Sequence, residues 1–155
     1  MNSEVTGAGF VIFFDNRKNL VKEKEKEILY LTLTDFKGKY DFPKGTIDPF
    51  EKSFNCAVRE TYEETKLKHG KNFQLYKDQK KNFSKGLVMY LASYNLDFKD
   101  IHDSIDLRKH VELLPNFKTG VLEHTSFDWL TYNQATSKLP NYLKDVLEWA
   151  KLNIN

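Results

Sequence analysis

The order of apolar and polar residues predicts strands in the first third of the chain. Residues 8–14 form an apolar run rich in β-branched and aromatic side chains, which is typical of a buried strand. Residues 28–34 alternate leucine with tyrosine or threonine, the period-two pattern of a half-buried strand. The two strands are expected to form a hairpin. In its connection, residues 15–27, alternating Lys and Glu favour a solvated loop over a helical turn.

Loops, strands and helices alternate in the rest of the chain. Residues 36–50 contain Gly and Pro and are expected to be a loop, while 73–77 and 86–94 are expected to be strands joined by a basic turn. Residues 98–120 mix charged and apolar side chains, so they either hold short elements or form a flap. The pattern ends with a short strand at 127–130, a short helix at 131–138 and a last helix beginning near Pro140.

No repeat or interdomain linker interrupts these elements, so we expect one α+β domain over residues 1–155, layered α/β/α. The net charge of +2 is too balanced for a general nucleic-acid binder. The longest apolar runs are far shorter than the roughly 20 residues that span a bilayer. Cys56 is the only cysteine, which rules out an internal disulfide and fits a reducing compartment. Because residues 1–7 also lack a signal-peptide pattern, we expect a cytoplasmic protein without membrane contact.

Residues 53–65 have the spacing of a helix with one buried side. Glu60, Glu63 and Glu64 lie three and four residues apart, so a helix places their carboxylates on one face. The neighbouring, core-facing stripe consists of Phe54, Ala57, Val58, Thr61 and Thr65. A hard cation such as Mg²⁺ prefers oxygen ligands and would relieve the repulsion between the three carboxylates. Taken alone, however, such glutamates are more typical of a solvated helix surface.

The surrounding residues change that balance. The stretch from 45 to 67 resembles the Nudix box, G-x5-E-x7-R-E-U-x-E-E-x-G-U, in which U is a bulky apolar residue. Its matching positions are Gly45, Glu51, Arg59, Glu60, Glu63, Glu64 and Leu67. Six fixed matches arise by chance on the order of once in a hundred thousand such chains. Thr61 replaces the first bulky apolar residue, and Lys66 replaces the glycine. The helix end therefore either needs no left-handed residue or is capped differently.

The resemblance implies the Nudix fold, a mixed β-sheet sandwiched between helices, and a hydrolase that depends on Mg²⁺, with Mn²⁺ as a substitute. It implies that Glu51 and Arg59 brace the loop and the helix. The metal ligands implied are Gly45 (by its carbonyl), Glu60, Glu63 and Glu64. The catalytic candidates are Arg59, together with Glu63 and Glu123 as rival general bases.

Outside the box, residues 8–13, 41–49 and 122–130 are similar to asymmetric diadenosine tetraphosphate hydrolases, which cut a dinucleoside polyphosphate into a nucleoside triphosphate and a monophosphate. Two features differ from that group: residues 97–120 form a longer segment, and Tyr90 follows Met89 where two adjacent aromatics are usual. Residues 42–45 (Phe-Pro-Lys-Gly) and 56–60 (Cys-Ala-Val-Arg-Glu) are equally similar to mRNA-decapping and diphosphoinositol polyphosphate hydrolases. A nucleotide-binding Nudix domain without catalysis is a further alternative.

The expected partner is thus a small nucleotide, with capped RNA as a second candidate and the oligomeric state left open. Lys44 and Lys85 are the residues expected to contact its phosphates, since a lysine ammonium acts there as a point charge. Tyr40 and Tyr90 are expected to stack on a nucleobase, an interaction that any aromatic face can make.

Overall fold

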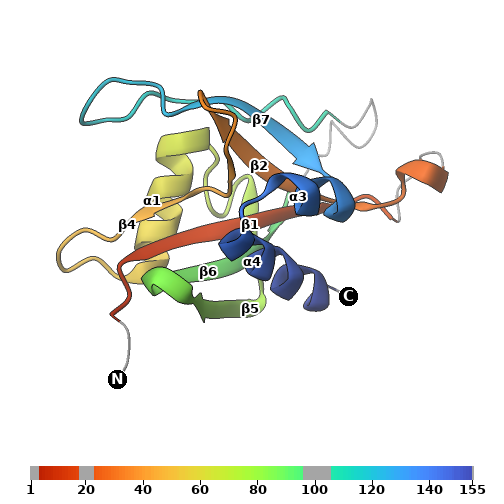
Figure 1. The fold of residues 1–155 in the computed structure, drawn as a ribbon, viewed down its shortest axis with the longest axis horizontal. Helices are drawn as coiled ribbons and strands as arrows, with labels where there is room; N and C mark the ends of the chain where they lie inside the picture. Colours follow the sequence, from red (N-terminus) through yellow and green to blue (C-terminus); the bar gives the residue numbers. More distant parts are fainter. Residues whose placement is uncertain (1–3, 18–22, 96–105, 155) are drawn as a thin grey trace.

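The computed structural model describes residues 4–17, 23–95 and 106–154, and in it a mixed β-sheet lies between helices (Figure 1). The strands are β1 (Gly7–Asp15), β2 (Ile28–Asp35), β3 (Tyr40–Asp41), β4 (Lys44–Thr46), β5 (Phe73–Phe83), β6 (Leu87–Tyr94) and β7 (His124–Leu130). The helices are α1 (Ser53–Thr65), α3 (Tyr132–Lys138) and α4 (Asn141–Leu152), with 3-10 turns η1 (Glu23–Glu25) and η2 (Ser84–Gly86). The predicted layered α+β architecture is confirmed, and α1 has the predicted bounds.

The sheet is built around β1. The strand order is β3-β2-β1-β6-β5, while β4 pairs with β1 and β7 pairs with β2. The pairing of β1 with β6 is parallel and the other pairings between the described strands are antiparallel. The sheet is therefore mixed. Its central strand, β1, pairs both with β4, which precedes α1, and with β6.

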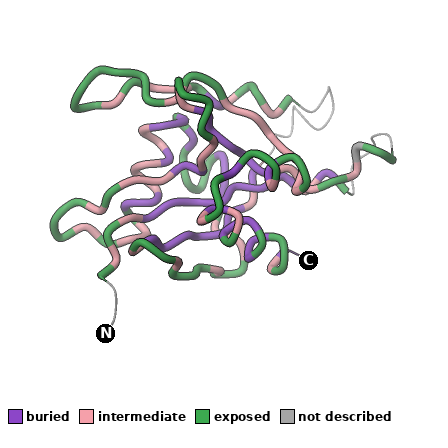
Figure 2. The backbone as a smooth tube through the Cα atoms, in the orientation of Figure 1, coloured by how far each residue is buried: buried purple, intermediate pink, exposed green. Residues whose placement is uncertain are grey.

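Two hydrophobic cores lie on opposite faces of this sheet. Because successive side chains of a strand point to opposite faces, Phe10 and Ile12 of β1 enter the core beneath α1, while Val11 and Phe13 enter the core beneath α4. Figure 2 shows the buried positions gathered on the central strands. This double burial explains why residues 8–14 form a continuous apolar run.

β2 is buried on both faces, which corrects the expectation of a half-buried strand. Tyr30 and Leu31 are 1% and 0% exposed and enter opposite cores. The buried Thr32 hydroxyl donates a hydrogen bond to the Asp128 carbonyl at 3.1 Å, so its polar group is paired. The alternating pattern identified the strand, but the second covering layer comes from helices distant in sequence.

β5 runs through the segment expected to be a turn, which is a second correction. Its register against β6 shifts between Leu75 and Lys80, and within this bulge Lys77 and Asp78 have φ of 51° and 53°. The strand then pairs with β6 again up to Phe83. β5 is an edge strand, where lysines oppose pairing with a further strand. Its basic residues therefore belong largely to a sheet edge.

The connection between β1 and β2 ends in the 3-10 turn η1, and residues 18–22 of the expected loop lie outside the described residues. The Asn16 N–H donates to the Glu27 carbonyl at 3.0 Å and closes the hairpin. The hairpin predicted from residues 8–14 and 28–34 is confirmed, with antiparallel pairing from Phe13 and Tyr30 onward.

Both C-terminal helices begin within one residue of their predicted starts. Thr131 caps α3 in a capping box, accepting the Gln134 N–H at 3.2 Å and donating its own N–H to the Gln134 side chain at 3.0 Å. Pro140 is the N-cap of α4 rather than its first residue. No helix among the described residues is long and apolar enough to cross a membrane.

The segment before β7 packs onto the end of α1. Residues 98–105 of the expected flap lie outside the described residues, and residues 106–123 hold neither helix nor strand. Val111 is nevertheless 8% exposed, and the Glu112 N–H donates to the Thr65 carbonyl at 2.9 Å. This packing carries Glu123 to the start of β7, beside α1.

Candidate active site

Close contact between β1 and the segment before α1 sets the position of the site. A side chain at Gly9 would overlap the Pro43 carbonyl and the Lys44 backbone, so glycine lets the two segments meet. The Phe10 N–H donates to the Pro43 carbonyl at 3.0 Å. Residues 43–45 are thereby held against the centre of the sheet, next to α1.

α1 turns two of its glutamates toward this segment. The Glu64 carboxylate accepts a hydrogen bond from the Lys44 N–H at 2.9 Å, and its side chain is 9% exposed. The Glu60 carboxylate lies against the α-carbon of Gly45. The neighbouring stripe of α1, with Ala57 and Thr61 fully buried, anchors the helix to the core. The carboxylates therefore border the Lys44–Gly45 backbone.

Arg59 braces the loop before α1. Its guanidinium donates to both oxygens of Glu51, at 2.8 and 2.9 Å, and to the Thr46 carbonyl at 3.0 Å. It also donates to Glu60 at 2.9 Å and to Glu63 at 3.1 Å. The bidentate pair with Arg59 lowers the pKa of Glu51 to about 2. These contacts make Arg59 a positioning residue that ties loop and helix together.

The acidic groups next to β4 are poorly compensated. Burial raises the pKa of Glu60, although Arg59 opposes the rise. Burial also raises the pKa of Glu64 well above its usual value, and the nearby carboxylates Asp41, Glu60 and Glu123 raise it further. Buried like charges favour protonation, and a divalent cation would reverse that preference. This electrostatic situation fits a group of residues that holds an ion.

Two residues from the start of β7 complete the cluster. Glu64, Glu123 and His124 each offer a ligand atom, and these atoms lie within 4.8 Å of one another. His124 Nδ1 is 3.3 Å from Glu64 Oε2. Burial lowers the pKa of His124, which favours the neutral imidazole that can ligate a metal. Carboxylates dominate the donor set and suit Mg²⁺ or Mn²⁺.

Of the ligands predicted from the sequence, Glu60 and Glu64 border the Lys44–Gly45 backbone. Arg59 binds the carboxylates of both Glu60 and Glu63, and the Glu63 side chain is 24% exposed. His124 was not among the predicted ligands. Its position next to Glu123 in the sequence could have suggested a ligand, but only the pairing of β7 with β2 brings His124 to α1.

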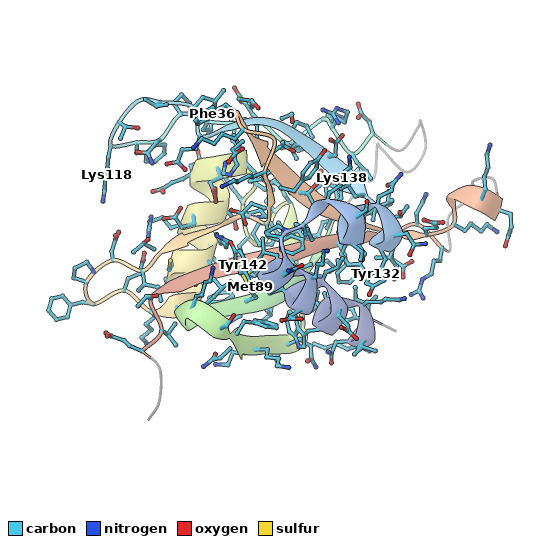
Figure 3. All side chains as sticks on the ribbon, viewed as in Figure 1. Phe36, Met89, Lys118, Tyr132, Lys138 and Tyr142 are labelled. Carbon is cyan, nitrogen blue, oxygen red and sulfur yellow. The ribbon has the colours of Figure 1, made fainter. Side chains whose placement is uncertain are left out.

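Two predicted phosphate-binding lysines meet at an aromatic residue. The Nζ atoms of Lys44 and Lys85 lie 5.8 and 4.6 Å from the ring centroid of Tyr142. Tyr142 is in the first turn of α4 (Figure 3). Burial by itself lowers the pKa of Lys44, but Asp41, at 3.3 Å, and Tyr142 outweigh it and raise the pKa. Tyr142 was not a predicted site residue, because its helix brings it to β4 only in the tertiary structure.

The two tyrosines expected to stack on a base differ. Tyr40 is half-buried, with Lys138 Nζ 5.8 Å from its ring centroid. Tyr90 is 5% exposed, and its hydroxyl shares a 2.7 Å hydrogen bond with the Ser53 hydroxyl. The Tyr90 ring contacts Phe54, with centroids 5.2 Å apart. The prediction of base stacking at Tyr90 is therefore wrong, because β6 turns this side chain into the core beneath α1.

The two departures from the Nudix box have structural consequences. Lys66 adopts φ of 67° at the end of α1 and donates its N–H to the Tyr62 carbonyl at 2.8 Å. The expectation that this helix end needs no left-handed residue is therefore wrong, since lysine takes the conformation usual for glycine. Thr61 is fully buried, and its hydroxyl has no hydrogen-bond partner among the described residues.

Cys56, one turn before Glu60, is fully buried. Burial raises the pKa of its thiol to about 12. The thiolate needed for nucleophilic chemistry is therefore disfavoured, and Cys56 acts as a packing residue.

Comparisons with known proteins identify the family of this chain. A model of the NUDIX domain family matches residues 6–150. The m7GpppN-mRNA hydrolase dcap-2 of Caenorhabditis elegans is 32% identical over 113 residues, which are 70% of this chain but only 13% of that longer protein. Two structures of the C. elegans Ap4A hydrolase share the fold. One, a binary complex, has a TM-score of 0.65, 21% identity and coverage of 94% of this chain and 96% of that one.

The other Ap4A hydrolase structure has a TM-score of 0.58 at 23% identity and covers 97% of this chain and 93% of that one. A Nudix hydrolase from M. smegmatis, RenU, has a TM-score of 0.65 at 13% identity, with coverage of 97% and 87%. The predicted Nudix fold is thereby confirmed. Since the family model matches nearly the whole chain, the protein belongs to the Nudix family.

Proposed function

We propose that this protein is a metal-dependent Nudix hydrolase that cleaves a phosphoanhydride bond of a dinucleoside polyphosphate. The observation that carries the proposal is the buried Glu64, which lies within 4.8 Å of ligand atoms from Glu123 and His124 and one turn from Glu60. A carboxylate this buried needs a compensating cation to stay ionised. The chemistry of the donors selects a hard divalent ion, Mg²⁺ or Mn²⁺.

In this proposal Glu64, Glu123 and His124 hold the ion, together with Glu60 and the Gly45 carbonyl. The ion would neutralise charge developing on a phosphoryl group and make water more acidic. Glu63 is then the general base, because its carboxylate lies at the more exposed edge of the helix face. Substituting Glu63 by Gln should lower kcat and leave Mn²⁺ affinity intact, whereas Glu123→Gln should weaken Mn²⁺ binding. The reverse pattern would exchange the two roles.

Lys44, Lys85 and Tyr142 support a polyphosphate substrate. Lys44 precedes Gly45 in β4, and its ammonium group lies 3.3 Å from Asp41 and 5.8 Å from the ring centroid of Tyr142, where Lys85 adds a second positive charge. Lysine ammonium groups bind phosphate oxygens as point charges. The structural likeness to the C. elegans Ap4A hydrolase supports a dinucleoside polyphosphate in particular.

A second candidate function is hydrolysis of an mRNA cap. It is favoured by the sequence similarity to dcap-2, which is named as an m7GpppN-mRNA hydrolase. A cap is also a dinucleoside polyphosphate, so the same ion and lysines would serve it. The difference lies in whether an RNA chain follows the second nucleotide.

A substrate panel with Mg²⁺ tests these functions. Diadenosine tetraphosphate, capped RNA, a diphosphoinositol polyphosphate and oxidised nucleoside triphosphates are incubated with the protein, and the products are resolved by chromatography. We expect diadenosine tetraphosphate to give ATP and AMP, with oxygen-18 from solvent water in one product. Glu64→Gln serves as the matched inactive control. Tight nucleotide binding by calorimetry without product over hours would instead indicate a non-catalytic binding domain.

A further inference from the structure

We propose that Asn116 is a positioning residue that holds the Glu123 carboxylate at the metal-binding cluster; this inference rests on the proposed function. Asn116 Nδ2 donates a hydrogen bond to Glu123 Oε1 at 2.6 Å. It is the one hydrogen bond of the Glu123 side chain among the described residues. Glu123 belongs to the group whose ligand atoms lie within 4.8 Å of Glu64 and His124.

The orientation of the Asn116 amide is determined by its other contacts. Asn116 Oδ1 accepts the N–H groups of Lys118 and Thr119, at 2.9 and 3.1 Å. A flipped amide would point its NH₂ group at two donors, so Nδ2 must be the atom that faces Glu123. A carboxylate that accepts this bond still has free lone pairs for an ion.

The backbone of Asn116 closes a small hairpin over residues 116–121. Its N–H donates to the Val121 carbonyl at 2.8 Å, and its carbonyl accepts the Gly120 N–H at 2.8 Å. Figure 3 labels Lys118 at the outer end of this loop. Asn116 is therefore held by both main-chain and side-chain bonds, and its free donor is presented to Glu123 from a closed turn.

Glu123 needs such a partner because of where it lies. It is exposed and stands one residue before β7 begins, so β-pairing does not restrict its side chain. An exposed glutamate has many rotamers, and each must be lost when it ligates an ion.

Metal binding without substrate provides the test. The Mn²⁺ dissociation constant is measured by electron paramagnetic resonance for the wild type, N116S, T119A, E123Q and the N116S/E123Q double variant. Serine keeps an acceptor for the turn but is too short to reach Glu123. Thr119→Ala removes the acceptor of the Val121 N–H, at 3.2 Å, and leaves the bond between Asn116 and Glu123 intact. T119A is thus the matched control for a loosened hairpin.

We expect N116S to weaken Mn²⁺ binding by about 10- to 100-fold, the usual effect of losing a partner of a ligand. T119A should stay within about twofold of the wild type, and N116S should add nothing in the E123Q background. With substrate, N116S should lower kcat more than it changes KM.

The inference would be overturned by unchanged Mn²⁺ affinity in N116S, by an equal loss in T119A, or by additive losses in the double variant. Failure of the wild type to bind Mn²⁺ would overturn it as well. If the Mn²⁺ pattern appears but no phosphoanhydride is cut, the positioning role stands and the proposed hydrolase function fails.

Discussion

The α-carbon of Gly45 lies directly against the carboxylate of Glu60, so that a methyl group at position 45 would overlap it. This contact joins the strand β4 to the acidic face of α1 without any intervening side chain. Glycine is required here by the close approach of Glu60, and φ at this residue is not in the left-handed region.

Gly45→Ala should therefore displace Glu60 and impair metal binding while the fold is retained. Glu60 is a flexible side chain and can move, and alanine slightly reduces the entropy of the unfolded chain. We expect stability to change by less than about 1 kcal/mol in thermal unfolding. Turnover should fall by about 100-fold, as expected for a misplaced ligand.

Gly70→Ala is the contrasting variant. Gly70 has φ of 89° and no heavy atom within 4 Å of an added methyl group, so alanine strains the backbone without touching the site. It should lower the melting temperature and leave Mn²⁺ affinity unchanged. Normal metal binding in Gly45→Ala would contradict the role assigned to this contact.

Glu64→Gln should abolish stabilisation by metal. Because burial raises the pKa of Glu64 in the folded state, its ionisation destabilises the metal-free fold as pH rises from about 4.5 through that raised pKa. At pH 7 without metal, the variant should be at least as stable as the wild type. Millimolar Mg²⁺ should raise the melting temperature of the wild type alone, since a ligand stabilises only the state that binds it. Equal shifts in both proteins would argue against Glu64 as a ligand.

The pair Glu51–Arg59 predicts a specific pH dependence. The pKa of Glu51 is lowered from 4.5 to about 2, so the stability it contributes is present above pH 4.5 and is lost as pH falls toward 2. Glu51→Gln should lower the free energy of unfolding at pH 7 by about 1–3 kcal/mol, as for loss of a hydrogen bond to a charged group. Urea titrations at pH 7, 5 and 3 should show the difference between the two proteins shrinking only in the most acidic sample. A constant difference would contradict this origin.

Thr61→Val should stabilise the protein. The Thr61 hydroxyl is fully buried without a partner among the described residues, and valine has nearly the same shape. Removing an unpaired buried hydroxyl should raise the free energy of unfolding by about 1 kcal/mol, measured by urea denaturation.

Thr65→Val is the matched control, because the Thr65 hydroxyl donates to the Thr61 carbonyl at 2.6 Å and accepts the Leu67 N–H at 3.2 Å. That change should destabilise the protein. If Thr61→Val and Thr65→Val change the free energy of unfolding in the same direction, the hydrogen bonding of the two hydroxyls does not explain the effects.

Local patterns in the chain determined the elements on which the site is built. Helical spacing predicted the bounds of α1, and the apolar run at 8–14 predicted β1, because both signals depend on residues close in sequence. The Nudix box is likewise one continuous stretch, which runs from β4 through the following loop to the end of α1. Its glutamates, Gly45 and Arg59 could therefore be recognised without the fold.

Contacts between distant segments were decided only by the tertiary structure. Tyr90 was expected to stack on a nucleobase, but the packing of α1 over β6 buries it. His124, Tyr142 and Asn116 reach the site because β7 pairs with β2, α4 covers β1, and a hairpin closes beside α1. Periodicity along a chain reports which side of an element is covered. It does not report which element covers it, since that choice depends on burial and pairing over long sequence distances.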